Sequence, residues 1–201
     1  MAKANWLKVD PSQGSGNATV KVSSSSEHTG RKARTTTLTW TAANVVDVVR
    51  NVSQAGKPEY VSMADSASAD KTGKLVTISG KSNSAKLTFS FGSGNLTNIT
   101  LPTSYTANSI NTNNGASING DPGATAEYNF SIAITVPANP DIEEKTRQII
   151  VTNEAGNTAI CTLRSAAGDA YVTVQDGTIE LDYLGTPVSW SVMSNTSWTI
   201  S

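Results

Sequence analysis

The chain of 201 residues repeats itself at a nearly constant offset in residue number, and this repeat constrains the fold more than any other feature. Four pairs of segments match in the same order along the chain. They are 19–23 with 131–135, 34–39 with 147–152, 52–62 with 163–173, and 73–84 with 185–196. Four ordered matches at nearly one offset indicate that the chain is built from a repeated unit.

The repeat divides the chain into one complete unit and two partial ones. The complete unit is formed by residues 60–170. Residues 171–201 resemble the beginning of a second unit and residues 1–59 resemble its end, and together they are shorter than the complete unit. The shortfall corresponds mostly to the stretch between Phe89 and Ser131, so we expect the central unit to carry an insertion near 91–126.

Short runs of alternating apolar and polar residues predict an all-β protein. Examples are "TVKVS" at 19–23, "KLVTISG" at 74–80 and "SIAITV" at 131–136, separated by Gly, Asn, Asp and Pro. Residues 44–52 could suggest a helix, but their many β-branched side chains favour a strand. Units of about 100 residues match the size of one β-sandwich. We therefore expect two immunoglobulin-like sandwiches, one of them split between the two ends of the chain.

Charge and hydropathy exclude several classes of function. The net charge of −1 gives no basic footprint for nucleic acid. The N-terminus has no apolar signal segment, and no run of about 20 apolar residues could cross a membrane. A single cysteine, Cys161, allows no intrachain disulfide and is expected to be a small buried hydrophobe.

The sequence offers no arrangement for catalysis, and we expect no enzymatic activity and no cofactor. The one histidine, His28, is predicted to lie solvated in a turn beside the basic cluster at 30–34. That cluster is typical of solvated charge, with contact to an acidic surface as the alternative. Acidic residues could supply oxygen ligands, but their segment is more typical of a solvated loop, so we expect no metal at Asp121, Asp141, Glu143 or Glu144.

Read from Tyr171 to Ser201 and on from Met1, the motifs resemble those of the BACON domain. They are "SNTSW" (194–198), "WLKVDP" (6–11), "GSGN" (14–17), "HTGRKAR" (28–34) and "VSQAG" (52–56). Trp198 fits the first tryptophan of the family pattern and Trp6 the second. The order of the two pieces is reversed along this chain, and residues 60–170 match weakly because they lack both tryptophans.

The BACON family is an immunoglobulin-like sandwich common in Bacteroidales proteins and in the crAss-like phages that infect them. The resemblance implies carbohydrate binding, but sugar sites need exposed aromatic platforms. Trp6, Trp40, Trp190 and Trp198 lie in strand-like runs and are expected in cores. Tyr105, in the predicted insertion, is the aromatic residue expected to be exposed.

These observations predict a structural protein of a phage virion, an auxiliary or decoration subunit made in the host cytoplasm. The alternatives are a carbohydrate-binding adhesion module and a part of a larger cell-surface enzyme. We expect residues 171–201 to complete 1–59 of the same or, more readily, a neighbouring copy, through Trp6, Tyr171, Val172, Trp190 and Trp198. The insertion is expected to project and touch the major capsid protein, another virion subunit or a glycan through Tyr105, Ile110 and Ile118.

Overall fold

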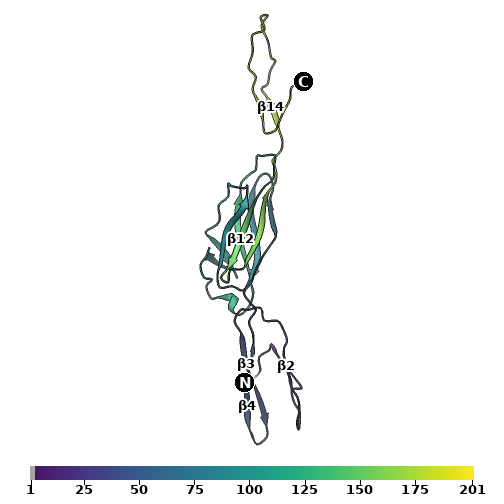
Figure 1. Cartoon of the computed structure of the whole chain (residues 1–201), viewed down its shortest axis with the longest axis vertical. Coiled ribbons are helices and arrows are strands. Elements are labelled where there is room, and N and C mark those ends of the chain that lie inside the picture. Colours follow the sequence, from purple (N-terminus) through teal and green to yellow (C-terminus); the bar gives the residue numbers. More distant parts are fainter. Residues whose placement is uncertain (1–2) are drawn as a thin grey trace.

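A computed structural model describes residues 3–201, which form a long, narrow molecule with a sandwich in its middle (Figure 1). Two hairpins precede the sandwich: β1 (Leu7–Asp10) with β2 (Lys21–Ser24), and β3 (Arg34–Ala42) with β4 (Val45–Gln54). One hairpin follows it: β14 (Val172–Val174) with β15 (Val192–Ser194). The N-terminal and C-terminal hairpins lie at opposite ends of the molecule.

The central sandwich consists of two sheets and one 3-10 turn. Its elements are β5 (Val61–Met63), β6 (Ser66–Ala69), β7 (Lys74–Ser82), β8 (Leu87–Gly94), β9 (Ser104–Ala107), β10 (Ile110–Asn113), η1 (Pro122–Ala124), β11 (Tyr128–Val136), β12 (Lys145–Asn153) and β13 (Thr158–Ser165). One sheet has the order β10-β9-β11-β7-β5 and the other β6-β13-β12-β8.

This strand order is that of an immunoglobulin-like sandwich. Strands β5, β7, β11 and β9 take the places of A, B, E and D, while β8, β12 and β13 take those of C, F and G. The first strand changes sheets, because β5 pairs antiparallel with β7 and the following β6 pairs parallel with β13. The predicted immunoglobulin-like, all-β fold is therefore confirmed for this part of the chain.

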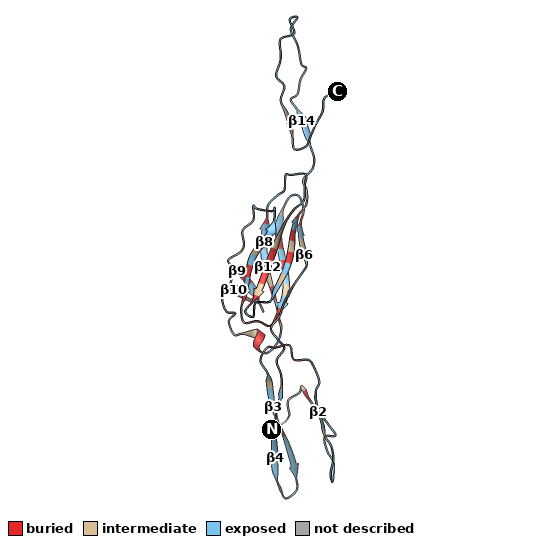
Figure 2. Cartoon of the chain, viewed as in Figure 1, coloured by how far each residue is buried: buried red, intermediate tan, exposed pale blue. Residues whose placement is uncertain are grey.

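The main hydrophobic core lies within the central sandwich (Figure 2), and Leu7 and Leu38 are buried apolar residues of the N-terminal hairpins. Alternate residues of β7, β8, β11, β12 and β13 point inward, as the period of two predicts. Phe89 sits in the middle of this core, 5.0 Å from the ring of Tyr105 and 5.8 Å from that of Phe130. Cys161 is buried as predicted, and burial raises the pKa of its thiol to about 11.

The prediction that residues 91–126 project as a loop is wrong. This stretch contains the end of β8, both strands β9 and β10, and η1. Strand β9 pairs with β11, and β10 extends the sheet beyond β9. The extra residues therefore widen one sheet of the sandwich and contribute to its core.

The terminal hairpins are largely exposed (Figure 2). Residues 45–54 form β4, which confirms a strand where a helix was the alternative. The 3-10 turn is the one helical element of residues 3–201, and it is too short to cross a membrane.

Candidate self-assembly surfaces

The N-terminal hairpins are held to the central sandwich by a joint centred on the buried side chain of Asn83. Its Nδ2 donates to the backbone oxygens of Thr29 at 3.2 Å, Lys57 at 3.2 Å and Pro58 at 3.3 Å. Its Oδ1 accepts a hydrogen bond from the amide of Tyr60 at 3.0 Å. One amide side chain of the sandwich thus binds both the segment that joins the two hairpins and the segment that leads from β4 into the sandwich. Its own polar atoms are satisfied.

Arg31 strengthens the same joint from the predicted basic cluster. Its guanidinium donates to both carboxylate oxygens of Asp121, at 2.5 and 2.6 Å, and its backbone amide donates to the oxygen of Gly123 at 2.9 Å. The hydrogen bond from Arg31 holds the pKa of the Asp121 carboxyl below its ordinary value. Arg31 is therefore a contact to an acidic residue of the same chain, whereas Lys32 is mostly solvated.

A second joint repeats the first between the central sandwich and the C-terminal hairpin. Asn195 Nδ2 donates to the backbone oxygens of Pro140 at 3.1 Å and Asp169 at 2.9 Å, and its Oδ1 accepts from the amide of Tyr171 at 3.0 Å. The repeat relates each of these four residues to one residue of the first joint. The pairs are Asn195 with Asn83, Pro140 with Thr29, Asp169 with Pro58, and Tyr171 with Tyr60. We call two residues counterparts when the repeat relates them in this way. Their residue numbers differ by 112 for residues 19–23 and 67–84, and by 111 for residues 28–63 and 87–90.

The turns beside the two joints also match. His28 Nε2 donates to the backbone oxygen of Lys32 at 2.6 Å, and its counterpart Asn139 donates through Nδ2 to that of Glu143 at 2.8 Å. Both side chains are buried. The prediction that His28 is solvated is therefore wrong, because its ring fills the turn and replaces the amide of Asn139.

The C-terminal hairpin has the pairing register of the first two strands of the sandwich. In the sandwich Val61 pairs with Ser82 and Met63 with Gly80. In the hairpin the counterparts of these residues pair with each other, Val172 with Ser194 and Val174 with Val192. Strands β14 and β15 thus correspond to β5 and to the end of β7.

The hairpin of β3 and β4 has the register of β12 and β13. Its first pair, Arg34 with Gln54, has as its counterpart the pair of Lys145 with Ser165. The structure therefore shifts the predicted match of residues 34–39 from 147–152 to 145–150. The N-terminal segment presents the last two strands of a sandwich, and the C-terminal segment presents the first two.

Core positions of the sandwich are uncovered at their counterparts in the C-terminal segment. Leu87 and Phe89 are at most 2% exposed, whereas their counterparts Trp198 and Ile200 are 49% and 85% exposed. Strand β7 shows the same contrast, since Val76 is buried and its counterpart Val188 is exposed. Several apolar side chains that a complete sandwich would bury lie open to solvent at this end.

The N-terminal hairpins show the same exposure. Trp40 on β3 is 42% exposed, although its counterpart Val151 is fully buried. A hollow of about 520 Å³ separates the two hairpins, and both contribute to its lining, with Val9 and Pro11 on one side and Leu38 and Trp40 on the other. Leu38 and Trp40 of β3 line this hollow, and their counterparts Ile149 and Val151 belong to the core of the sandwich.

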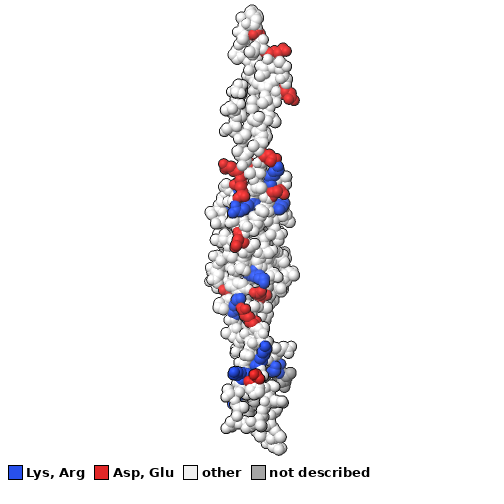
Figure 3. All heavy atoms as spheres, turned by 90° about the vertical axis from the view of Figure 1, so that its right-hand side faces the viewer, with Lys and Arg blue, Asp and Glu red and all other residues white. Residues whose placement is uncertain are grey.

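The two ends of the molecule carry opposite charge. Residues 171–201 hold three carboxylates and no Lys or Arg, and residues 1–59 hold eight Lys or Arg against four Asp or Glu. In Figure 3 the C-terminal end shows acidic groups alone, and the N-terminal end shows mainly basic ones. Such opposite ends attract each other at low ionic strength.

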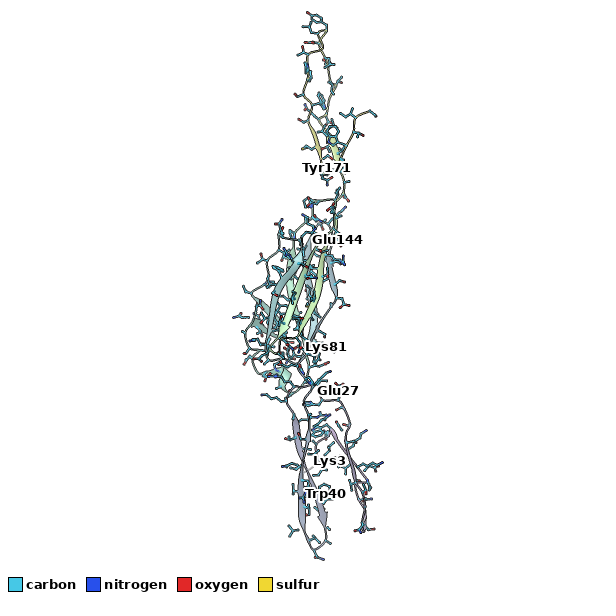
Figure 4. All side chains as sticks on the ribbon, in the orientation of Figure 1. Lys3, Glu27, Trp40, Lys81, Glu144 and Tyr171 are labelled. Carbon is cyan, nitrogen blue, oxygen red and sulfur yellow. The ribbon has the colours of Figure 1, made fainter. Side chains whose placement is uncertain are left out.

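The residues predicted for assembly all lie in the terminal segments or at their joints. Trp6 is half-buried beneath the guanidinium of Arg34, 4.6 Å from its ring, and Trp190 donates from Nε1 to the backbone oxygen of Gln175 at 2.8 Å. Trp198, Tyr171 and Val172 are about half exposed. Figure 4 shows Tyr171 beside the second joint and Trp40 among the hairpins at the far end. The tryptophans predicted to be core residues are thus partly uncovered in this chain.

Two of the three residues predicted to contact a partner belong to the core instead. Tyr105 is 2% exposed, and its hydroxyl accepts a hydrogen bond from the amide of Leu87 at 3.3 Å. Ile118 is buried in the same cluster, and Ile110 is half-buried on the edge strand β10. The burial of Tyr105 and Ile118 follows from the pairing of the insertion with the sheet, and it removes both as surface contacts.

Three of the four acidic residues considered as metal ligands pair with basic side chains. Asp121 binds Arg31, Asp141 pairs with Lys145, and Glu144 pairs with Arg164 at 2.6 Å. Within residues 3–201 no three side chains of the His, Cys, Asp or Glu type are grouped so that they could hold a metal ion.

Comparisons with known proteins identify remote structural similarity only. No family model and no curated protein matches the sequence. Among solved structures, the chain is similar to the collagen-binding domain of the surface protein RspB of Erysipelothrix rhusiopathiae, at 11% identity and a TM-score of 0.23. The match covers 75% of this chain and 63% of that structure, so the chain spans less than two thirds of its neighbour.

Proposed function

We propose that this chain is a non-enzymatic structural protein whose copies join head-to-tail. In this proposal, residues 171–201 of one copy complete the sandwich whose end residues 1–59 of the next copy supply. The observation that carries the proposal is that both the joint and the strand register of the sandwich recur in the terminal segments. In these segments, residues whose counterparts form the core are exposed to solvent. The chain therefore contains both parts of a second sandwich but holds them apart.

Pairing of the two terminal segments is energetically favoured over leaving their apolar faces and strand edges exposed. Exposed apolar faces and unpaired strand edges promote association, and a strand supplied by another chain satisfies both. The contact uses different surfaces on the two copies, so it repeats as an open chain or closes as a ring. The opposite charges of the two ends orient copies for the same contact.

We place this assembly in a phage virion, as an auxiliary or decoration subunit. The support is the resemblance of the joined terminal segments to the BACON domain of crAss-like phages and their hosts. Mass spectrometry of purified particles tests the setting. Stoichiometric amounts of the chain in washed particles would support it, and its absence from them would contradict it.

The assembly itself is tested with two complementary truncations. One variant lacks residues 171–201 and keeps the N-terminal segment; the other lacks residues 1–56 and keeps the C-terminal one. Each is expected to be monomeric alone, and an equimolar mixture is expected to give a complex of one copy each by light scattering. A mixture that stays monomeric at every accessible concentration would contradict the proposal.

Carbohydrate binding is the second candidate, and the exposed Trp40 favours it. This ring borders a hollow that also has polar lining from Thr37, Thr39 and Gln13, a combination suited to a sugar. A glycan array with the intact chain separates the candidates. Specific glycan binding that Trp40→Ala abolishes would favour adhesion; the structural proposal predicts no specific glycan binding.

A further inference from the structure

We infer that residues 185–201 of one copy thread between the two N-terminal hairpins of a second copy, in the register of the central sandwich, and that Ile179 packs beside them. The segment would pair with β2 on one side and with β3 on the other. This inference rests on the proposed function and specifies its interface residue by residue. We assign a second copy as the partner. The N-terminal hairpins lack neighbours that correspond to β7 and β8, and residues 185–201 of this same sequence correspond to those strands.

The first contact is given by the pairing of β7 with β11. In the sandwich Ile78 lies opposite Ile132, and Val76 lies opposite Ile134. The counterparts of Ile78 and Val76 are Trp190 and Val188, and those of Ile132 and Ile134 are Val20 and Val22. Trp190 is therefore assigned a place opposite Val20 of the second copy, and Val188 opposite Val22. Each assigned pair is apolar, as its counterpart is.

The second contact is given by the pairing of β8 with β12. There Phe89 lies opposite Val151, and both face the core. Their counterparts are Ile200 and Trp40, so Ile200 of one copy covers the exposed ring of Trp40 in the next. The most exposed apolar side chain of residues 185–201 thus meets the tryptophan that borders the open hollow.

The third contact comes from the strand that changes sheets. The turn around Asp70 recurs around Asp182, because Gly73 donates to the oxygen of Asp70 and Gly185 to that of Asp182, each at 3.0 Å. In the register of these turns, Ala67 corresponds to the exposed Ile179. Ala67 lies opposite Leu163, the counterpart of Val52, so Ile179 is assigned to Val52 of the second copy.

One residue departs from this apolar pattern. Arg50 is the counterpart of the buried Cys161, and its guanidinium donates to the backbone oxygen of Val49 at the surface. A charged group at a core position has to be paired or reach solvent. The C-terminal segment of the partner carries three carboxylates and no Lys or Arg, so added salt is expected to weaken the interface between the two ends.

Engineered cysteines test the register. Ser189 and Lys21 are counterparts of Thr77 and Ala133, which lie opposite each other on the outer face of the sheet. Cα atoms of opposite residues are about 4.5 to 5.5 Å apart, which a disulfide can span. A chain carrying Ser189→Cys and Lys21→Cys is expected to give a ladder of linked oligomers on non-reducing gels. The native Cys161 does not compete, because it is fully buried.

The matched control carries Ser189→Cys with Ser23→Cys, on the same strand and face but two residues out of register. Diagonal neighbours are about 7 to 8 Å apart, beyond the usual disulfide span, so this variant is expected to give little ladder. A stronger ladder from the control, or linked monomers that show closure within one chain, would overturn the inference. If sedimentation shows that the parent chain assembles but the chain with Ser189→Cys and Lys21→Cys forms no disulfide-linked ladder, the register alone would be overturned. A parent chain that never assembles would overturn both the register and the proposed function.

Discussion

Single amide side chains organise both joints of this molecule. Asn83 and Asn195 each lie in a Ser-Asn-Ser/Thr triplet, and the preceding serine donates to the backbone oxygen of Tyr60 or of Tyr171. The triplets were visible in the sequence as part of the repeat. Their role was not, because it depends on carbonyl groups brought in from distant connections of the chain.

Replacing Asn83 with alanine is expected to destabilise the first joint. The change leaves three carbonyl groups and one amide without their partner inside the protein, at a cost of about 3 kcal/mol in the free energy of unfolding. Urea unfolding measures the loss. The matched variant Asn195→Ala acts at the exposed second joint and is expected to cost less than about 1 kcal/mol. Equal losses at the two positions would contradict this account.

The turn at His28 is expected to accept asparagine but not alanine. Asn139 makes the same bond to the residue four positions later, so His28→Asn should keep that bond, whereas His28→Ala should lose about 1 kcal/mol of turn stability. Hydrogen exchange of the amides of residues 29–34 reports the turn directly. Faster exchange in the asparagine variant than in the alanine variant would show that the two turns are not equivalent.

The ion pair of Arg31 with Asp121 is expected to make the first joint sensitive to acid. Because the pKa of Asp121 is lowered in the folded state, its contribution is complete above the unfolded value of about 3.9 and is lost as pH falls through the folded value. The difference in unfolding free energy between the parent and Asp121→Asn should therefore be constant at neutral pH and shrink below about pH 4. A difference that grows on acidification would contradict the assignment.

At the scale of elements, alternation identified the strands but not which of them share a core. The period of two correctly predicted the strands at 74–80 and 131–136, and the β-branched side chains of 44–52 correctly favoured a strand there. The insertion was misjudged because its composition is polar, although Tyr105 and Ala107 alternate with polar residues on a short strand. The joint at Arg31 was missed for a different reason: an ion pair between residues so far apart in the chain leaves no local pattern.

The central sandwich is expected to fold without either terminal segment. All of its core residues lie between Ala69 and Leu163, so removing both ends deletes none of them. A fragment of residues 57–170 should show cooperative urea unfolding and a β-type circular dichroism spectrum. Unfolding without a cooperative transition would mean that the hairpins contribute to the core in a way that their exposure does not indicate.

At the scale of the whole molecule, the chain carries one complete sandwich, and we propose that its terminal hairpins are the two parts of another. Its elongated shape, its two equivalent joints and its opposite terminal charges all favour a linear array with one direction. The sequence predicted the repeat, and the division of a second sandwich between the two ends stays a prediction. The equivalence of the joints required the structure, since it rests on hydrogen bonds between residues far apart in the chain.

Sedimentation velocity of the intact chain over a wide range of concentrations tests head-to-tail assembly most directly. We predict sedimentation coefficients that rise with concentration and fall back on addition of salt, while the variant lacking 171–201 stays a monomer throughout. An intact chain that sediments as a monomer at every concentration, with its fold preserved, would contradict this account.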